Sequence, residues 1–368
     1  MTAAHRSPDR PFFFIVLGLA LVGFFIFASA SLGLLGRPGA TFNLIAIKQL
    51  AVLVVGLVLF LVISKIDFRF WRRASLPIFV GAVILNLLLF IPGWGVTAGG
   101  ATRWLAVGPW TIQPSEFLKL GFVLYLAAWL AKAGGGRAVG NRILLPFVVI
   151  LALVAALMIA EPDLDTLVIM FAAGLGMLFA AGARWRHLLL IGLGVLVLIA
   201  ATAFFKPYIL TRVQTFLHPE ANPLGAGYQI NQSLIAIGSG GLTGRGFGQS
   251  IQKFKYLPEP IGDSVFSVAS EEFGFIGGSL IILLFLAFAL SGLKIAGRSQ
   301  NQFGGLVAVG LVIMIMAGAF INIGSMLGLI PLTGTPLLFV SHGGTALLLV
   351  LLEAGIILNV SRYRLNQK

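Results

Sequence analysis

The stretch YLPEPIGDSVFSVASEEFGF, residues 256–275, concentrates carboxylates in a chain that has few of them. It contains Glu259, Asp263, Glu271 and Glu272, whereas the 368 residues hold only 12 acidic side chains in total. A carboxylate in a suitable environment can act as a general base. The chain becomes almost purely apolar directly after this stretch, so we expect these carboxylates to lie at the edge of a membrane span.

Cationic side chains precede the carboxylates in the same part of the sequence. Arg212, Arg245 and Lys253 suit either an anionic ligand such as a phosphate group or the anionic headgroups of lipids. The glycine-rich run GSGGLTGRGFG, residues 238–248, lacks the Gly-Lys-Ser/Thr ending of a nucleotide-binding loop. We interpret this run either as a backbone nest for a pyrophosphate or headgroup, or as a flexible turn.

A second charged pair stands in the segment QPSEFLKL. Glu116 and Lys119 are three residues apart, which places them on one face of a helix. Charges at membrane depth usually pair with each other or line a cavity. The pair is therefore either a structural ion pair or a component of a site, and one pair can be both.

The remaining acidic groups also allow purely structural interpretations. The turn EPDLDT carries Glu161, Asp163 and Asp165, which could bind a cation or cap the following helix. Glu353 lies in an apolar segment without an obvious partner, which favours a structural or protonated carboxyl. The isolated histidines show no zinc-binding spacing, so the sequence predicts no metal site.

The elements that position these groups follow from composition. Hydrophobic residues make up 58% of the chain and charged residues 10%, which predicts an all-α integral membrane protein. A helix needs about 20 apolar residues to cross a bilayer. The sequence contains ten such stretches: Phe12–Leu35, Leu44–Ser64, Ser75–Ile91, Pro114–Ala131, Ile143–Ala160, Leu164–Ala183, His187–Phe205, Phe273–Leu293, Phe303–Gly328 and Leu337–Val360.

The net charge of +13 reflects topology rather than nucleic-acid binding. Most basic residues fall in every second loop or at the termini, as the positive-inside rule requires for two cytoplasmic chain ends. They are Arg6, Arg10, Lys65, Arg69, Arg72, Arg73, Lys132, Arg137, Arg142, Arg184, Arg186, Lys294, Arg298, Arg362, Arg364 and Lys368. We expect one polytopic domain, residues 1–368, in which the long segment 206–272 between the seventh and eighth spans lies outside. The chain has no cysteine, so disulfides and thiolate chemistry are excluded.

Four segments together resemble the SEDS family, the FtsW and RodA proteins, over all ten spans. They are GGATRWLAVGPWTIQPSEFLKL, EPDLDT, NPLGAGYQINQSLIAIGSGGLTGRGFGQSIQKFKYLPEPIGDSVFSVASEEFGFIG and PLTGTPLLFVSHGGT. The resemblance implies a peptidoglycan glycosyltransferase that polymerises lipid II at the outer face of the bacterial cytoplasmic membrane. It also implies a class B penicillin-binding protein as partner, with other divisome or elongasome membrane proteins. GYQINQS and GQSIQKFKYLPE look closer to FtsW-type than to RodA-type sequences, which favours division over elongation.

The family's essential acid lies in a Pro-Glu-x-x-x-Asp-Phe-x-Phe context, which corresponds to Asp263 here. The resemblance thus implies that Asp263 is the catalytic general base. It also matches Arg103, Glu116 and Lys119 to the family pattern. Together with the cationic and polar residues of the long outer segment, the set that we expect to bind substrate is Arg103, Glu116, Lys119, Arg212, Gln229, Gln232, Ser233, Arg245, Lys253 and Glu259. Basic residues, with or without a divalent cation such as Mg²⁺ or Mn²⁺, would stabilise the leaving pyrophosphate. The chain departs from the family pattern at Ser264, Asp165 and His342, where Phe, Gly and Tyr are usual.

Two other classes of function remain open at this stage. A lipid-precursor flippase needs a polar path across the membrane, and the polar residues here lie mostly on one side. A non-enzymatic scaffold for a transpeptidase would tolerate changes at Asp263. The bland interpretation of Glu271 and Glu272 is a favourable placement at a helix N-terminus.

Overall fold

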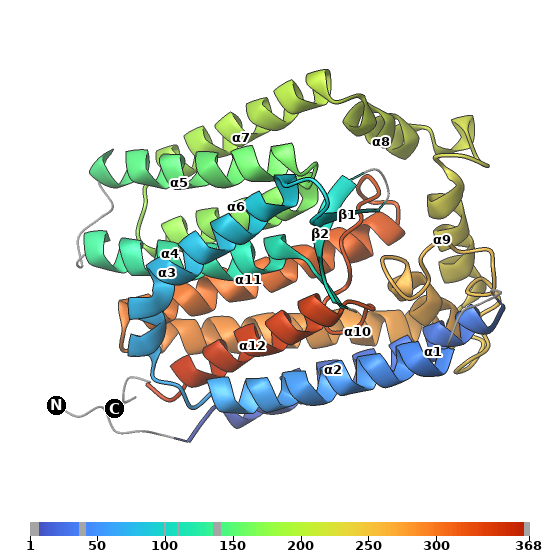
Figure 1. The fold of residues 1–368 in the computed structure, drawn as a ribbon. Helices are drawn as coiled ribbons and strands as arrows, with labels where there is room; N and C mark the ends of the chain where they lie inside the picture. The colour runs from blue at the N-terminus through green and yellow to red at the C-terminus, as the bar shows by residue number, and fades with distance from the viewer. Residues whose placement is uncertain (1–6, 37–41, 99–100, 109, 135–140, 364–368) are drawn as a thin grey trace.

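The computed structural model describes residues 7–36, 42–98, 101–108, 110–134 and 141–363, which form a bundle of helices (Figure 1). The helices are α1 Arg10–Ser31, α2 Phe42–Ile63, α3 Phe68–Leu87, α4 Pro114–Gly134, α5 Asn141–Ala160, α6 Leu164–Ala180, α7 Trp185–Phe205, α8 Pro207–Leu217, α9 Tyr228–Ser239, α10 Val265–Gly297, α11 Gln302–Met326 and α12 Gly344–Val360. Four of the basic residues expected inside the cell, Arg6, Arg137, Arg364 and Lys368, lie outside the described residues.

The helices have the composition of membrane spans. Seven of the described helices, α1, α2, α3, α4, α7, α10 and α11, are long and apolar enough to cross a bilayer. Three more, in α5, α6 and α12, are apolar but shorter. α4 and α11 are the most deeply buried of the seven, whereas α7 exposes large aliphatic side chains such as Leu189 and Leu193. A multi-pass membrane protein accounts for this pattern, because lipid covers outward-facing apolar side chains.

The start of α1 and the end of α12 lie at the same end of the bundle. The backbone N–H of Asp9, before α1, donates to Ser361 Oγ after α12 at 2.9 Å. Asn359 Nδ2 donates to the carbonyl of Ser64 at 2.9 Å, so the α2–α3 connection also lies there. The short helices α8 and α9 lie toward the opposite end (Figure 1).

The connection between α3 and α4 is a small antiparallel sheet rather than an irregular loop. Its strands are β1 Gly95–Ala98, β2 Ala101–Val107 and β3 Trp110–Ile112, in the order β1-β2-β3. Leu105 is the one buried apolar side chain of its central strand. The sequence interpretation missed the sheet because its strands are short and its tryptophans also suit a membrane interface.

The starts of α3 and α12 differ from the predicted starts of these spans. α3 starts at Phe68 rather than Ser75, because Asp67 caps it by accepting from the N–H of Arg69 at 2.8 Å. α12 starts only at Gly344, whereas Leu337 was expected. The apolar run before it forms a turn in which the Leu337 N–H donates to Ser341 Oγ, and Phe339 has a φ of 69°.

The long segment 206–272 contains far more regular structure than a loop. α8 and α9 lie within it, and α10 begins at Val265, eight residues before the expected Phe273. α9 packs against α10 and α11, so the apolar run SLIAIG belongs to the bundle. α10 is interrupted at Gly274, which has φ 66° and ψ −163°. The helix therefore consists of a short segment, residues 265–273, followed by a long one.

Candidate active site

A polar cavity of about 290 Å³ opens beside Asp263. Its wall is built by α8, α9, the turn before α10 and the segment that follows α11. Arg212 of α8 and Gln229 of α9 line it together with Asp263, and Leu332, Thr333 and Gly334 close the other side. The structure thus brings together three of the side chains that the sequence assigned to the site.

Asp263 is held in place by its backbone neighbours. Asn322 Nδ2 of α11 donates to the Asp263 carbonyl and to the Thr335 carbonyl, both at 2.8 Å. Gln229 Nε2 donates to Ser264 Oγ at 3.2 Å. Because α9, α11 and the segment before α12 all contact this turn, they fix the position of the Asp263 backbone, from which the carboxylate extends.

Glu259 shapes the turn that leads to Asp263. Its carbonyl accepts from the N–H groups of Gly262 and Ser264 at 3.0 and 3.1 Å. The residue has a φ of 44°, a left-handed conformation that is uncommon outside glycine. Its side chain is exposed, so its direct contribution to the cavity is mainly its charge.

The carboxyl of Asp263 titrates near neutrality. Burial is the main cause that raises its pKa from 3.8 to about 7, and the negative charges of Glu259 and Asp165 add to the effect. Arg212 and Arg103 oppose this rise. A base with a pKa near 7 is about half ionised at pH 7 and binds a proton readily.

A second, very small polar cavity of about 20 Å³ shares Gly334 with the first. Arg103, Glu116 and Lys119 line it. Lys119 Nζ lies 2.7 Å from Glu116 Oε1, and both side chains are buried, which confirms the predicted pair. Glu353 of α12 also interacts electrostatically with Lys119, so it does have a charged neighbour.

Asp165 lines the small cavity and contacts two residues that line the Asp263 cavity. Its Oδ2 lies 3.4 Å from Arg212 Nη1 and accepts from the N–H of Gly334 at 3.3 Å. A side chain added at Gly334 would come within 3.7 Å of Asp263 Oδ2. Asp165 and Asp263 therefore approach Gly334 together, and the Arg212 guanidinium is already partnered by a protein carboxylate.

The other acids of EPDLDT serve the helix start and its surroundings. Asp163 caps α6 by accepting from the N–H and the hydroxyl of Thr166 at 3.3 and 3.0 Å, which confirms the capping interpretation. The Arg103 guanidinium donates to the Pro162 carbonyl. Burial, and then the charge of Asp163, raises the pKa of Glu161 to about 8.

An apolar groove of about 260 Å³ runs from this site between α6, α7, α8 and α11. Ile199, Ile209 and Ile321 line it, and Asp165 and Arg212 stand at its polar end. An amphiphilic molecule would fit this arrangement, since its charged group would meet Arg212 while its hydrocarbon lay in the groove.

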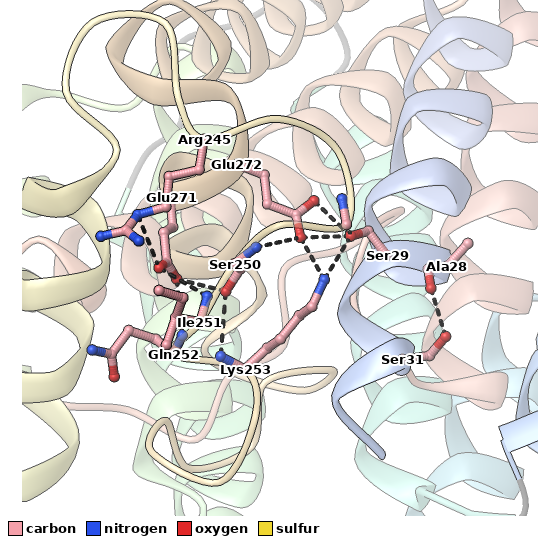
Figure 2. A network of polar contacts seen from close by, with 11 residues as sticks. Ala28, Ser29, Ser31, Arg245, Ser250, Ile251, Gln252, Lys253, Glu271 and Glu272 are labelled. Carbon is pink, nitrogen blue, oxygen red and sulfur yellow. Dashed lines mark hydrogen bonds and ion pairs between the residues drawn. The ribbon is translucent and has the colours of Figure 1, made fainter. Parts of the chain in front are cut away.

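Several predicted site residues lie away from the cavity. The buried Ser233 Oγ donates to Met326 Sδ at 3.3 Å, and Gln232 does not line the cavity. Lys253 is fully buried against Glu272, with Nζ 2.7 Å from Oε1. Arg245 lies 3.5 Å from Glu271 Oε1 at the edge of the same network (Figure 2).

Two further interpretations require correction. The glycine-rich run is not a nest for an external anion, because the N–H groups of Arg245 and Gly246 donate to the carbonyls of Glu271 and Glu272. Glu271 and Glu272 do not start a helix. They lie at the end of the short segment of α10 and are fully buried within polar contacts.

Sequence reasoning missed Asn322, Thr333 and Gly334. Asn322 is a fully buried amide in an apolar helix, and that isolation was the available signal. Thr333 and Gly334 belong to the motif PLTGTP, which supported the resemblance but carried no assigned residues.

The fold and the site define a multi-pass helical membrane protein. A cavity lined by an ionisable carboxyl lies at one end of the bundle, with an apolar groove beside it. The chain belongs to the FtsW, RodA and SpoVE family of cell cycle proteins, whose profile matches residues 10–366. The resemblance to the SEDS family is therefore confirmed.

The relatives agree with this assignment. Stage V sporulation protein E of Bacillus subtilis (strain 168) is 39% identical over 363 residues, which cover 99% of both chains. A protein of Thioalkalivibrio sulfidiphilus (strain HL-EbGR7), named "Probable peptidoglycan glycosyltransferase FtsW", is 38% identical over 94% of this chain and 88% of its own.

Solved structures share the fold. A chain from a structure described as "Structural coordination of polymerization and crosslinking by a peptidoglycan synthase complex" superposes with a TM-score of 0.80 at 27% identity, covering 97% of this chain and 98% of its own. The rod shape determining protein RodA of Thermus thermophilus gives a TM-score of 0.71 at 25% identity, over 98% and 99% of the two chains.

Proposed function

We propose that this protein is a peptidoglycan glycosyltransferase that polymerises lipid II, a lipid-linked disaccharide, into glycan strands. The observation that carries the proposal is the ionisable Asp263 in a cavity with Arg212, beside an apolar groove. The substrate of such an enzyme is an amphiphile with a sugar, a pyrophosphate and a long hydrocarbon chain. Each of these parts has a matching environment within the site.

The reaction assigns a proton transfer to Asp263. Its carboxylate takes the proton from the 4-hydroxyl of the acceptor sugar as that oxygen attacks the anomeric carbon of the donor. The bond from that carbon to the pyrophosphate oxygen breaks, the configuration inverts, and undecaprenyl pyrophosphate leaves. A base with a pKa of about 7 suits this step.

The departing pyrophosphate needs positive charge. Arg212 lies on the cavity wall, and Arg103 contributes to the potential at Asp263. The residues described by the structure do not bring three His, Asp or Glu side chains together, so their donor set does not fit a cation site built by the protein alone. We assign the neutralisation of this charge to Arg212 and Arg103 because of their place at the cavity and their effect on Asp263.

The proposed topology has ten spans, made of the seven long helices and the three shorter ones. Both termini are cytoplasmic and the Asp263 cavity faces outward from the bacterial cytoplasmic membrane. The shared position of Asp9 and Ser361 supports a common side for the chain ends. Lys65 and Arg298 lie near that end, beside Ser64 and Gln300, which bond to the end of α12.

The proposed partner is a class B penicillin-binding protein, within a larger set of divisome or elongasome membrane proteins. The structural match to a chain of a peptidoglycan synthase complex supports this pairing. We assign the chain to division, since its motifs resemble the FtsW type and a relative named FtsW is 38% identical. The 39% identity to a stage V sporulation protein adds sporulation as a third process, which motif comparison had not considered.

The test is glycan polymerisation from purified lipid II, by the chain alone and with a candidate class B transpeptidase. We expect polymer from the wild type and none from folded Asp263→Asn. Glu220→Gln is the matched control, because Glu220 is an exposed carboxylate on the same side that lies outside the cavity. Polymer from Asp263→Asn would reject Asp263 as the base. Movement of lipid II across liposome membranes without any polymer would instead favour a flippase. Binding of the transpeptidase with neither polymer nor movement of lipid II would favour a scaffold.

A further inference from the structure

The break in α10 is filled by the glycine-rich segment. In a continuous helix the N–H groups of Phe275 and Ile276 would donate to Glu271 and Glu272. Here they donate to the carbonyls of Gly241 and Leu242 at 2.8 and 3.1 Å. The carbonyls of Glu271 and Glu272 accept instead from Arg245 and Gly246, at 3.0 and 2.9 Å. The segment therefore replaces two helical hydrogen bonds with four of its own.

Glycine makes this close approach sterically feasible. A Cβ on Gly244 would lie 2.1 Å from the Glu272 carbonyl oxygen, and one on Gly240 would lie 2.1 Å from the Ser270 carbonyl oxygen. Gly274 has the positive φ of the break itself. The glycines thus serve backbone packing against α10, which explains their concentration in this segment.

A buried network, which we call the carboxylate clasp, then fixes the same segment (Figure 2). It consists of Ser29, Ser250, Lys253, Glu271 and Glu272. The Glu271 carboxylate accepts from Ser250 Oγ at 2.5 Å and from the N–H groups of Ile251 and Gln252 at 3.0 and 3.2 Å. The turn that follows the glycine-rich run is thereby wrapped around a carboxylate of α10.

The other carboxylate of the clasp ties in α1. Glu272 accepts from Lys253 Nζ at 2.7 Å and from Ser29 Oγ at 2.6 Å, and Lys253 Nζ also lies 3.1 Å from Ser29 Oγ. Lys253 and Ser29 have no exposed surface, and Glu272 has almost none. A buried ion pair is weak evidence for added stability. It does favour one arrangement of the chain, because any arrangement that separates the pair leaves a buried charge without a partner.

The clasp and the cavity occupy the two ends of one short helical segment. Residues 265–273 begin two residues after Asp263 and end one residue after Glu272. At about 1.5 Å per residue, Asp263 lies roughly 12 Å from Glu271 along this segment. A rigid segment of that length carries any shift at one end to the other.

We propose that Lys253 and Glu272 are positioning residues that hold Asp263 in its catalytic geometry through this short segment of α10. The inference rests on the proposed function, since it concerns the base of that reaction. Neither residue lines the cavity, so neither contacts the substrate there. Their effect is on the orientation of the base, and a displacement of about 1 Å can cost on the order of a hundredfold in rate.

The main test uses Lys253→Met/Glu272→Leu, which removes both charges and leaves no buried charge unpaired. Purified wild type and variant are compared for polymerisation of lipid II, with kcat expressed per folded molecule from a size-exclusion and thermal-unfolding assay. We expect kcat to fall about tenfold or more while KM stays within about twofold. We also expect the acid limb of the pH profile to move to lower pH, because a loosened segment admits water to Asp263.

A milder pair of variants keeps the test decisive if the double variant does not fold. Ser29→Ala removes the hydroxyl that joins Glu272, Lys253 and the N–H of Gly248, and Ser29→Thr restores a hydroxyl. We expect kcat to fall in Ser29→Ala and to recover in Ser29→Thr. Glu220→Gln again serves as the control and should leave kcat, KM and the pH profile unchanged.

The opposing outcomes are distinct. Unchanged kcat per folded molecule in these variants, beside an active wild type and an inactive Asp263→Asn, would overturn the positioning role and leave the proposed function intact. A loss explained entirely by a smaller folded fraction would overturn it in the same way. Absence of polymer from the wild type under all conditions would reject the proposed function itself, and the positioning role with it.

Discussion

The short segment of α10 carries carboxylates at both ends, and their environments are opposites. Glu271 and Glu272 are fully buried, and each accepts hydrogen bonds from several donors besides a cationic neighbour. Asp263 is partly buried beside a cavity, its pKa is raised to about 7, and no ion pair holds its carboxylate within the described residues. Carboxylates a few turns apart thus divide into a structural pair and a reactive group. The number of hydrogen-bond donors around each carboxylate distinguishes the structural carboxylates from the reactive one.

The largest expected effect on stability comes from breaking the clasp. Lys253→Met leaves the Glu272 carboxylate buried without its cation, which should destabilise the protein by about 3–5 kcal/mol. Arg245→Gln is the matched control, because Arg245 is partly exposed at the edge of the network and should contribute no more than about 1 kcal/mol. Chemical unfolding in detergent measures both. Equal, small losses would show that the clasp is no stronger than a surface pair.

At the other end of the segment, removing the Asp263 carboxylate is expected to raise the stability of the protein. A raised carboxyl pKa opposes folding above about pH 7, and the cost disappears below the ordinary value of 3.8. Asp263→Asn should therefore stabilise the protein at pH 8, by on the order of 4 kcal/mol, and bring little gain at pH 4. Thermal unfolding at the two pH values measures this difference. A destabilised Asp263→Asn at pH 8 would contradict the assignment of Asp263 to the reactive class.

Asp165 stands between the two classes, because it is paired and also lies at the site. Its carboxylate pairs with the Arg212 guanidinium and so competes with the substrate pyrophosphate for that group. Asp165→Asn should free Arg212 and lower the KM for lipid II by about threefold, on the order of 0.6 kcal/mol. Steady-state polymerisation kinetics test this effect.

Asp163→Asn is the control for that experiment. It weakens the cap of α6 but does not release Arg212, so KM should not change. A KM that rises in Asp165→Asn would show that Asp165 helps to bind the substrate rather than competing with it.

The smallest expected effect comes from the exposed charge near the base. Glu259 raises the pKa of Asp263 by repulsion, so Glu259→Gln should lower that pKa and move the acid limb of activity to lower pH by a few tenths of a unit. The pH dependence of polymerisation between pH 5.5 and 8 reports the shift. Movement of the limb to higher pH would mean that Glu259 acts through the shape of the turn instead of its charge.

Local patterns predicted the helices and much of the cavity. The Glu116–Lys119 pair and the Asp163 cap follow from spacing alone, and apolar runs gave the membrane helices. Asp263, Arg212 and Gln229 were assigned to a site and do line one cavity. The assignment came from family resemblance for Asp263, since pattern alone did not separate it from its neighbours.

The clasp escaped prediction because its partners are distant in sequence. Ser29 and Glu272 are separated by 243 positions, and nothing near Ser29 signals a buried carboxylate. Their sequence suggested that Lys253 and the glycine-rich run bind an external anion. In the structure they contact Glu271 and Glu272 of the protein itself. The late start of α12 at Gly344 has a similar cause, since the apolar run before it is a turn whose hydrogen bonds include the Ser341 hydroxyl and the Ile261 carbonyl.

The most direct measurement is the rate of glycan polymerisation across pH 5.5 to 9 for the wild type and Asp263→Asn, at saturating lipid II and equal folded protein. We expect the wild-type rate to rise with pH through about 7 and then level off, and the variant to stay at background throughout. A variant that still polymerises, with the same rise near pH 7, would show that another group is the base.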